Sequence, residues 1–173
     1  KLLEACKEST NKQLHTIVVL ALSTGMRKGE ILNLKRRDVF LNERFLVLDK
    51  TKNKERRRVP IIGYSHEILA QHLKIARLDS EYIFPSKDGK QPIDIKRPWE
   101  VALSKAGITD FRFHDLRHSC ASYLAMNGAT QRDLMEVLGH KTVQMTKRYS
   151  HLSDSHISAV VGSMNDKIFG GVK

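Results

Sequence analysis

The sequence is poor in the features that stabilise secreted proteins or anchor a chain in a membrane. Its two cysteines, Cys6 and Cys120, cannot build a disulfide framework, and neither lies in a CxxC motif. The longest continuous apolar run, Ile17 to Leu22, has six residues and is too short to span a bilayer. No signal peptide is visible at the N-terminus. We therefore expect a protein of the reducing cytoplasm with no membrane partner.

The sequence also has fewer acidic than basic residues. Nineteen Asp and Glu stand against thirty Lys and Arg, which gives a net charge of +11 in a chain of 173 residues. A surplus of that size indicates a polyanionic partner, and nucleic acid is the usual one. The chain has no internal repeat, and its length favours one domain with a real core. Because it begins at Lys1 without methionine, we expect it to be a fragment of a longer protein.

The apolar pattern and the turn residues predict a mostly α fold with a small three-stranded antiparallel β-sheet, in the α+β class. The three strands are expected at Val39–Leu41, Phe45–Leu48 and Arg56–Ile61. Tyr82–Phe84 is expected to be a short extended piece. Six helices are expected at Leu14–Ser23, Arg27–Lys35, Tyr64–Leu78, Pro98–Ala106, His114–Asn127 and Ser153–Ile168, and Gly25 ends the first of them. A further helix is expected to begin at its cap, Thr130, and to end at Gly139. A short helix after Thr142 is expected to hold Tyr149.

Five short stretches carry the side chains that suggest chemistry. They are Thr24–Glu30, Thr51–Lys54, His114–His118, Leu138–His140 and Arg148–Ser150. Together they supply arginines, histidines, lysines and a tyrosine. If the fold brings these side chains together, they form a cationic pocket with a phenol beside it. Such a pocket can hold one phosphodiester and let the tyrosine oxygen attack it.

The HxxR pair, His114 and Arg117, lies on one face of an expected helix, about 60° apart around its axis. Ala121 and Ala125 fall on the same sector, and such small side chains leave room for a ligand. The opposite sector, which can face the core, holds Leu116, Cys120 and Tyr123. The alternative for the pair is a surface arginine beside a core histidine.

Arg27 follows Thr24-Gly25 at the expected start of a helix, where free backbone N–H groups favour anions. The planar forks of Arg27 and Arg117 can hold the two non-bridging oxygens of one phosphodiester and neutralise charge in the transition state. The alternative for Arg27 is an ion pair with Glu30. In either case we expect Glu30 to orient a pocket residue.

The segment from Lys50 to Arg58 holds six basic residues and one acid. It lies between two expected apolar strands, so its tip can project from a fixed base, although most charge runs are only solvated surface. A mobile lysine at the tip can enter a groove and donate a proton, and Lys52 and Lys54 are both candidates. The basic residues expected to contact nucleic-acid phosphates are Lys50, Lys54, Arg56 and Lys141.

Tyr149 comes nine residues after His140, which itself lies just past a helix end. A free phenol has a pKa of about 10, so a tyrosine nucleophile needs a base or strongly positive surroundings. The two arginines and two histidines above can supply them. The alternative is a half-buried aromatic ring packed on Met145, one turn earlier.

In this order the motifs resemble the catalytic domain of the tyrosine recombinases, or phage integrases, from about Leu14 to Leu152. The resemblance implies that two arginines and the second histidine hold the scissile phosphate. The HxxR histidine assists proton transfer, the hairpin lysine protonates the leaving 5′ oxygen, and the tyrosine forms a 3′-phosphotyrosyl link. Carried onto this chain, the residues are Arg27, Lys52, His114, Arg117, His140 and Tyr149, with Lys52 taken before Lys54.

The resemblance also implies the partners. No metal or cofactor is expected, because the covalent link conserves the energy of the broken bond. The substrate is double-stranded DNA, and the active complex is a homotetramer on paired sites, assembled by exchange of a C-terminal tail helix at about 153–168. Residues 1–173 make one catalytic domain, and the family's N-terminal DNA-binding domain is absent from this chain. The setting is bacterial or phage-encoded and associated with the nucleoid.

Three other functions are compatible with parts of the pattern. His114 and His118 have the spacing of an HExxH zinc site, but Asp115 replaces the glutamate and Arg117 places a cation beside the metal. His118 is therefore expected to be a structural residue that supports the pocket. A type IB topoisomerase has a similar pocket but reseals the same strand, and the lysine-rich hairpin looks more like that of integrases. The third is a DNA-binding module without catalysis.

Overall fold

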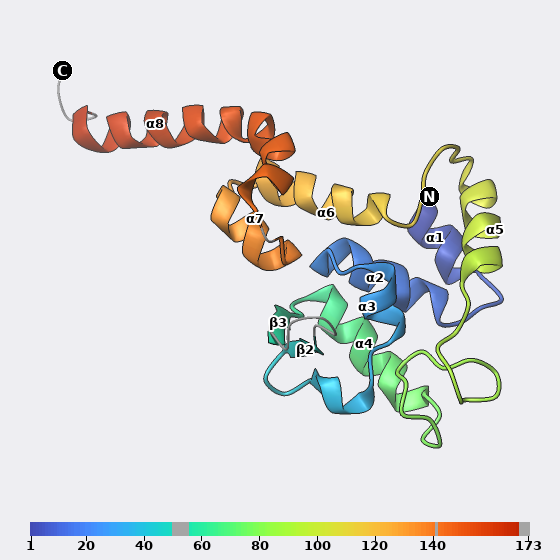
Figure 1. Ribbon diagram of the computed structural model, residues 1–173. Coiled ribbons are helices and arrows are strands. Elements are labelled where there is room, and N and C mark those ends of the chain that lie inside the picture. The colour runs from blue at the N-terminus through green and yellow to red at the C-terminus, as the bar shows by residue number, and fades with distance from the viewer. Residues whose placement is uncertain (50–55, 141, 170–173) are drawn as a thin grey trace. The chain divides into compact units, whose positions relative to one another are not determined.

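The computed structural model describes residues 1–49, 56–140 and 142–169 (Figure 1). The chain divides into two compact units, Lys1–Arg117 and His118–Lys173, called unit 1 and unit 2 below. The fold is mostly helical with one three-stranded sheet, as the sequence predicted. Among the described residues, no helix has the length and apolar character needed to pass through a lipid bilayer.

Unit 1 is built around a helix that is apolar on nearly every side. Its helices are α1 (Leu2–Lys7), α2 (Leu14–Thr24), α3 (Lys28–Leu32), the 3₁₀ turn η1 (Arg36–Asp38), α4 (Tyr64–Ile75) and α5 (Lys96–Ala106). Helix α2 packs against α1, α3 and α4, and its Leu14, Ile17 and Leu20 are fully buried. It ends at Gly25, which takes the left-handed conformation with φ 61° that glycine adopts without strain. The predicted end of this helix is confirmed.

The sheet of unit 1 has the order β1-β2-β3, with both pairs antiparallel. Its strands are β1 (Val39–Phe40), β2 (Phe45–Asp49) and β3 (Arg56–Pro60). Leu46 faces Val59 across the β2–β3 pair, and both side chains are buried in the core. The pairing runs out to Asp49 and Arg56, so the sheet holds both ends of the segment that carries Lys52. Lys52 itself lies outside the described residues.

Four helices of unit 1 differ from the sequence prediction. Helix α5 begins at Lys96 rather than at Pro98. Helix α3 ends at Leu32 rather than Lys35, because the chain then turns into strand-like pairing: Ile83 N–H donates to Leu34 O, and Lys35 forms a bridge with Tyr82. Helix α4 ends at Ile75 rather than Leu78. Helix α1 was not predicted, and it packs on α5 and buries Cys6. The extended piece at Tyr82 is confirmed by the bridge.

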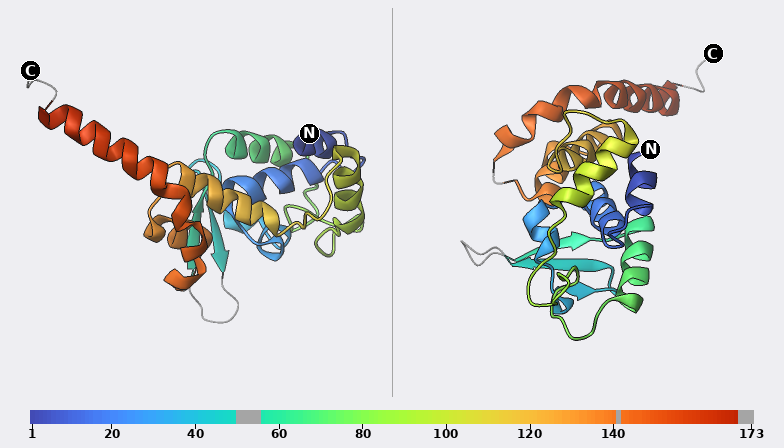
Figure 2. Two further views of the ribbon diagram at one scale, coloured as in Figure 1. Left: turned by 90° about the horizontal axis from the view of Figure 1, so that it is seen from above. Right: turned by 90° about the vertical axis from the view of Figure 1, so that its right-hand side faces the viewer.

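Unit 2 is a small helical assembly. It holds most of α6 (Asp115–Met126), whose first three residues belong to unit 1, followed by α7 (Gln131–Leu138), the 3₁₀ segments η2 (Val143–Met145) and η3 (Lys147–Ser153), and α8 (Asp154–Phe169). Thr130 caps α7, because its Oγ1 accepts from Asp133 N–H while the Asp133 carboxylate accepts from Thr130 N–H, as predicted. Helix α8 follows η3 directly in the chain and is the long red helix at the C-terminal end (Figure 2).

Candidate active site

The end of helix α2 positions two of the predicted arginines. Arg117 is 4% exposed, and its Nη1 donates to Gly25 O over 2.6 Å. Gly25 is the left-handed residue that ends α2, and Arg27 follows two residues later as the N-cap of α3. The hydrogen bond therefore anchors the Arg117 guanidinium to the same turn that carries Arg27.

Glu30 fixes the Arg27 side chain. Its carboxylate accepts from Arg27 N–H at 2.8 Å and from Arg27 Nη1 at 3.0 Å. The Arg27 side chain remains 43% exposed, so part of its guanidinium faces solvent. The ion pair between these two residues is present, and the same contact orients the arginine. A cation held in this way is prepared to bind an anion with little loss of side-chain entropy.

Arg57 shares the same carboxylate and was missed by the sequence analysis. Its Nη2 lies 3.2 Å from Glu30 Oε2, and its side chain is only 11% exposed. Burial lowers the pKa of Arg57, the charge of Arg27 lowers it further, and Glu30 opposes both. The signal was present in the sequence: Arg57 lies two residues before the buried Val59 on one strand, so both point to the same face. Arg57 thus ties β3 to the start of α3.

The surroundings of the HxxR pair differ from the prediction. His114 lies one residue before α6 and is exposed, which excludes the core-histidine alternative. Leu116 and Cys120 are buried as expected, but Tyr123 is 64% exposed rather than facing the core. The two alanines that lie on the same side of the helix as the HxxR pair are not exposed beside it. Ala121 and Ala125 are buried in the core of unit 2, together with Leu134, Leu138 and Tyr149.

Tyr149 is buried in unit 2, with 6% of its surface exposed. Its ring belongs to the apolar cluster that contains Ala121 and Leu134 and does not contain Met145. The alternative prediction, a half-buried ring packed on Met145, is therefore wrong. Its hydroxyl oxygen lies 2.6 Å from Nδ1 of His118. The predicted helix around Tyr149 is a 3₁₀ segment, closed by a hydrogen bond from Tyr149 N–H to Thr146 O.

His140 is positioned by the end of α7. Gly139 is left-handed with φ 63°, and His140 N–H donates to Met135 O at 2.9 Å. This double turn is the usual way in which a glycine closes a helix, and it leads the chain directly away from the helix axis. The His140 residue is half-buried in unit 2.

The predicted residues therefore fall in both units. Unit 1 holds Arg27, Glu30, Arg56, His114 and Arg117, and unit 2 holds His118, His140 and Tyr149. Lys50, Lys52, Lys54 and Lys141 lie outside the described residues. Within the part of the chain that is described, no group of three His, Cys, Asp or Glu side chains is arranged to hold a metal ion.

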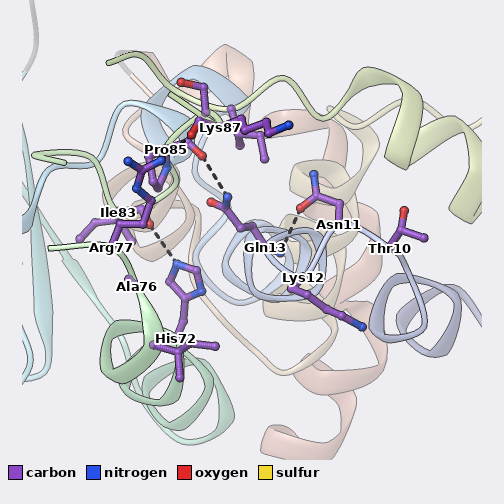
Figure 3. Close-up of a pocket in the computed structure, with 13 residues that line it drawn as sticks. Thr10, Asn11, Lys12, Gln13, His72, Ala76, Arg77, Ile83, Pro85 and Lys87 are labelled. Atoms are coloured by element: carbon purple, nitrogen blue, oxygen red, sulfur yellow. Dashed lines mark hydrogen bonds between the residues drawn. The ribbon is translucent and has the colours of Figure 1, made fainter. Parts of the chain in front are cut away.

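A separate cavity of about 610 Å³ in unit 1 contains none of these residues (Figure 3). Its polar groups mostly hold the loop after α4 in place. Gln13 Nε2 donates to Pro85 O at 2.9 Å, and His72 Nε2 bonds Ile83 O at 2.9 Å. Burial lowers the pKa of His72, which favours the neutral ring. The cavity is accordingly a feature of the loop packing.

Residues 1–156 match the model of the phage integrase family. The chain belongs to this family. It is 29% identical to the integrase of Salmonella phage P22 over 98% of this chain and 46% of that protein. It is 33% identical to the integrase of Haemophilus phage HP1 over 93% of this chain and 44% of that protein. The chain spans about half the length of the curated relatives it matches.

Solved structures show which part of the family the chain represents. The catalytic domain of bacteriophage HP1 integrase superposes with a TM-score of 0.71 at 32% identity, over 93% of this chain and 88% of that one. The XerH recombinase, solved in a post-cleavage complex with a difH substrate, gives a TM-score of 0.75 over 92% of this chain and 49% of that one. At 22% identity XerH shows the shared fold alone. The chain has the catalytic-domain fold of a tyrosine recombinase.

Proposed function

We propose that this domain cuts and rejoins DNA in site-specific recombination, through a 3′-phosphotyrosyl link and without a metal ion. The observation that carries the proposal is the arginine arrangement of unit 1. Arg117 is buried and anchored to Gly25 O, while Arg27 is held by Glu30 with part of its fork open to solvent. Two fixed guanidinium groups at one turn suit the two non-bridging oxygens of a phosphodiester.

The proposed reaction moves one phosphoryl group twice. Arg27, Arg117 and His140 hold the phosphate, and the Tyr149 oxygen attacks phosphorus while the bond to the 5′ oxygen breaks. Lys52 gives that oxygen its proton, and His114 assists proton transfer. The 5′ hydroxyl of a partner strand then reverses the step and frees the tyrosine. Bond energy is conserved, so neither nucleotide nor metal is consumed.

DNA is the proposed partner. The net charge of +11 gives the long-range attraction. Arg56, exposed at the start of β3, joins Lys50, Lys54 and Lys141 as proposed phosphate contacts. The XerH relative was crystallised on its DNA substrate, and other relatives are integrases of bacteriophages. We place the activity in the bacterial cytoplasm, on nucleoid or phage DNA.

The test is a suicide substrate, a nicked DNA site from which the short fragment that carries the free 5′ hydroxyl escapes after cleavage. A covalent protein–DNA adduct on a denaturing gel supports the proposal, and its absence on a cognate site contradicts it. Joining to a partner strand distinguishes a recombinase from a topoisomerase, which reseals the strand that it cut.

The role of Lys52 gives a separate prediction. Lys52→Ala is expected to slow cleavage of a normal 5′-oxygen substrate by about a hundredfold or more, as loss of a general acid does. A substrate with a bridging 5′-sulfur needs no proton for departure, so it should restore most of the rate. Cleavage is followed by adduct yield against time, with Lys54→Ala as the matched control. Rescue of the Lys54 variant instead would move the role two residues along.

Assembly is proposed to use helix α8. Four apolar residues on this helix remain about half exposed: Val160, Val161, Met164 and Ile168. The start of the helix lies beside the nucleophile, since a cavity of about 360 Å³ is lined by Tyr149, His156 and Val160. We propose that the apolar residues dock on a neighbouring protomer in a homotetramer on paired sites. Tail exchange would then couple the position of Tyr149 to assembly.

The matching experiment substitutes the distal residues of α8 and leaves those beside Tyr149 unchanged. Met164→Ser with Ile168→Ser is expected to weaken assembly on paired DNA sites by roughly tenfold, since two half-exposed apolar side chains lose about 1–2 kcal/mol of burial. Sedimentation measures assembly, and the suicide substrate measures cleavage at a single site. Leu78→Ser, at an 87% exposed residue just after α4, is the control. Equal assembly by the double variant would show that α8 packs only within its own protomer.

A further inference from the structure

The contact between His118 and Tyr149 goes beyond the structural role that the sequence predicted for the histidine. The distance from Nδ1 to the hydroxyl oxygen is 2.6 Å, a short hydrogen bond. The ring centroids are 6.3 Å apart with an interplanar angle of 40°, so the rings meet through these two polar atoms rather than by stacking. Both residues belong to unit 2.

The packing around the phenol explains why the contact is fixed. His118, Ala121 and Ala125 lie at i, i+3 and i+7 on α6, so they share one face of the helix. The two alanines are buried against the Tyr149 ring, and Leu134 and Leu138 of α7 belong to the same cluster. The small residues beside the HxxR motif therefore make room for the tyrosine.

We propose that His118 accepts the phenol proton of Tyr149 during cleavage, which makes it a catalytic residue; this inference rests on the function proposed above. In the neutral ring with its proton on Nε2, Nδ1 accepts from the hydroxyl. As the tyrosine oxygen bonds to phosphorus, its proton passes to Nδ1. The bond from phosphorus to the 5′ oxygen breaks, and that oxygen is protonated by the general acid. In the rejoining step, His118 returns the proton to the departing phenol.

The chemistry limits when this transfer takes place. A free phenol has a pKa of about 10 and a free imidazole one of about 6.5, so an imidazole is a weak base toward a phenol that has not begun to react. The transfer becomes favourable only as the oxygen gives its electrons to phosphorus. A hydrogen bond that is already formed places the base at the required distance from the start.

Replacing His118 with asparagine separates acceptance of a proton from simple contact. The amide of His118→Asn reaches about as far as Nδ1 and still forms hydrogen bonds, but it is not basic. Adduct formation on the suicide substrate is expected to slow by about a hundredfold, within the range for loss of a general base. Noncovalent DNA binding should be unchanged. The matched control is His66→Asn, which removes another histidine hydrogen bond, from Nε2 to Leu41 O.

A second change tests the chemistry directly. Introducing 2,3-difluorotyrosine at position 149 lowers the phenol pKa, so the nucleophile needs less help from a base. In the His118→Asn protein it should recover most of the lost rate, while in the wild-type background the gain should be small. A histidine that only positions the ring would give a loss that a more acidic phenol does not repair. The same analogue at Tyr123 serves as the control.

The outcomes are distinct. Slow cleavage by His118→Asn with rescue by the fluorinated tyrosine supports the inference. Cleavage at the wild-type rate, or a loss without rescue, overturns it and leaves the proposed function intact. An adduct that survives Tyr149→Phe also overturns the inference, because the nucleophile is then another residue. Only the absence of an adduct with the wild-type protein on a cognate site overturns the proposed function. If the asparagine variant fails to bind DNA, His118→Gln is measured in its place, with the same two outcomes.

Discussion

Tyr149→Phe is expected to abolish the covalent protein–DNA adduct. The substitution removes only the oxygen that attacks phosphorus and keeps the ring that packs against Ala121 and Leu134. Loss of the hydrogen bond to His118 should lower the free energy of unfolding by about 1 kcal/mol, too little to unfold the domain. Noncovalent DNA binding should therefore survive. A denaturing gel of the suicide substrate measures the adduct, and a gel shift measures binding.

The control for this experiment is Tyr123→Phe. Tyr123 lies on α6 and is 64% exposed, so its hydroxyl is available to solvent. The Tyr123 variant should form the adduct at the wild-type rate. An adduct formed by the Tyr149 variant would contradict the assignment, and Tyr123 would become the next candidate.

Exchanging either arginine for lysine is expected to slow cleavage by at least about a hundredfold, comparable with the loss of an oxyanion donor. Arg27→Lys and Arg117→Lys keep the positive charge but lose the planar fork that holds two phosphate oxygens. DNA affinity should change far less, because many other Lys and Arg contribute to phosphate binding in a chain of net charge +11. Cleavage rates at saturating protein separate the two effects.

The two arginines differ in how a lysine affects folding. Arg117 is buried and donates to Gly25 O, so its variant requires a thermal melt to establish that it remains folded. Arg27 is partly exposed, and its variant should melt close to the wild type. Arg112→Lys, at a side chain that is 88% exposed, is the matched control. Cleavage by both variants at nearly the wild-type rate would mean that a point charge is enough and that the fork is not required.

Local sequence signals predicted most of the elements correctly. The apolar run before Gly25 became α2 with its left-handed end, and Thr130 with Asp133 became the cap of α7. These features depend on residues within one or two turns of each other, so the sequence alone contains them. The errors came where distant segments compete. The end of α3 is set by pairing of Leu34 and Lys35 with the chain near Tyr82, which helical periodicity does not report.

The sequence by itself determined the identities and the order of the chemical groups, and these were enough to predict the family. Apart from the pair of Arg27 with Glu30, it did not determine which residues these groups contact. Only the tertiary structure decided that Glu30 is shared by Arg27 and Arg57 and that Arg117 bonds to Gly25 O. It also decided that the alanines of α6 enclose Tyr149. Such contacts join residues that are mostly tens of positions apart, and they form because the core brings separate elements together, whereas periodicity and capping act only between neighbours in the chain.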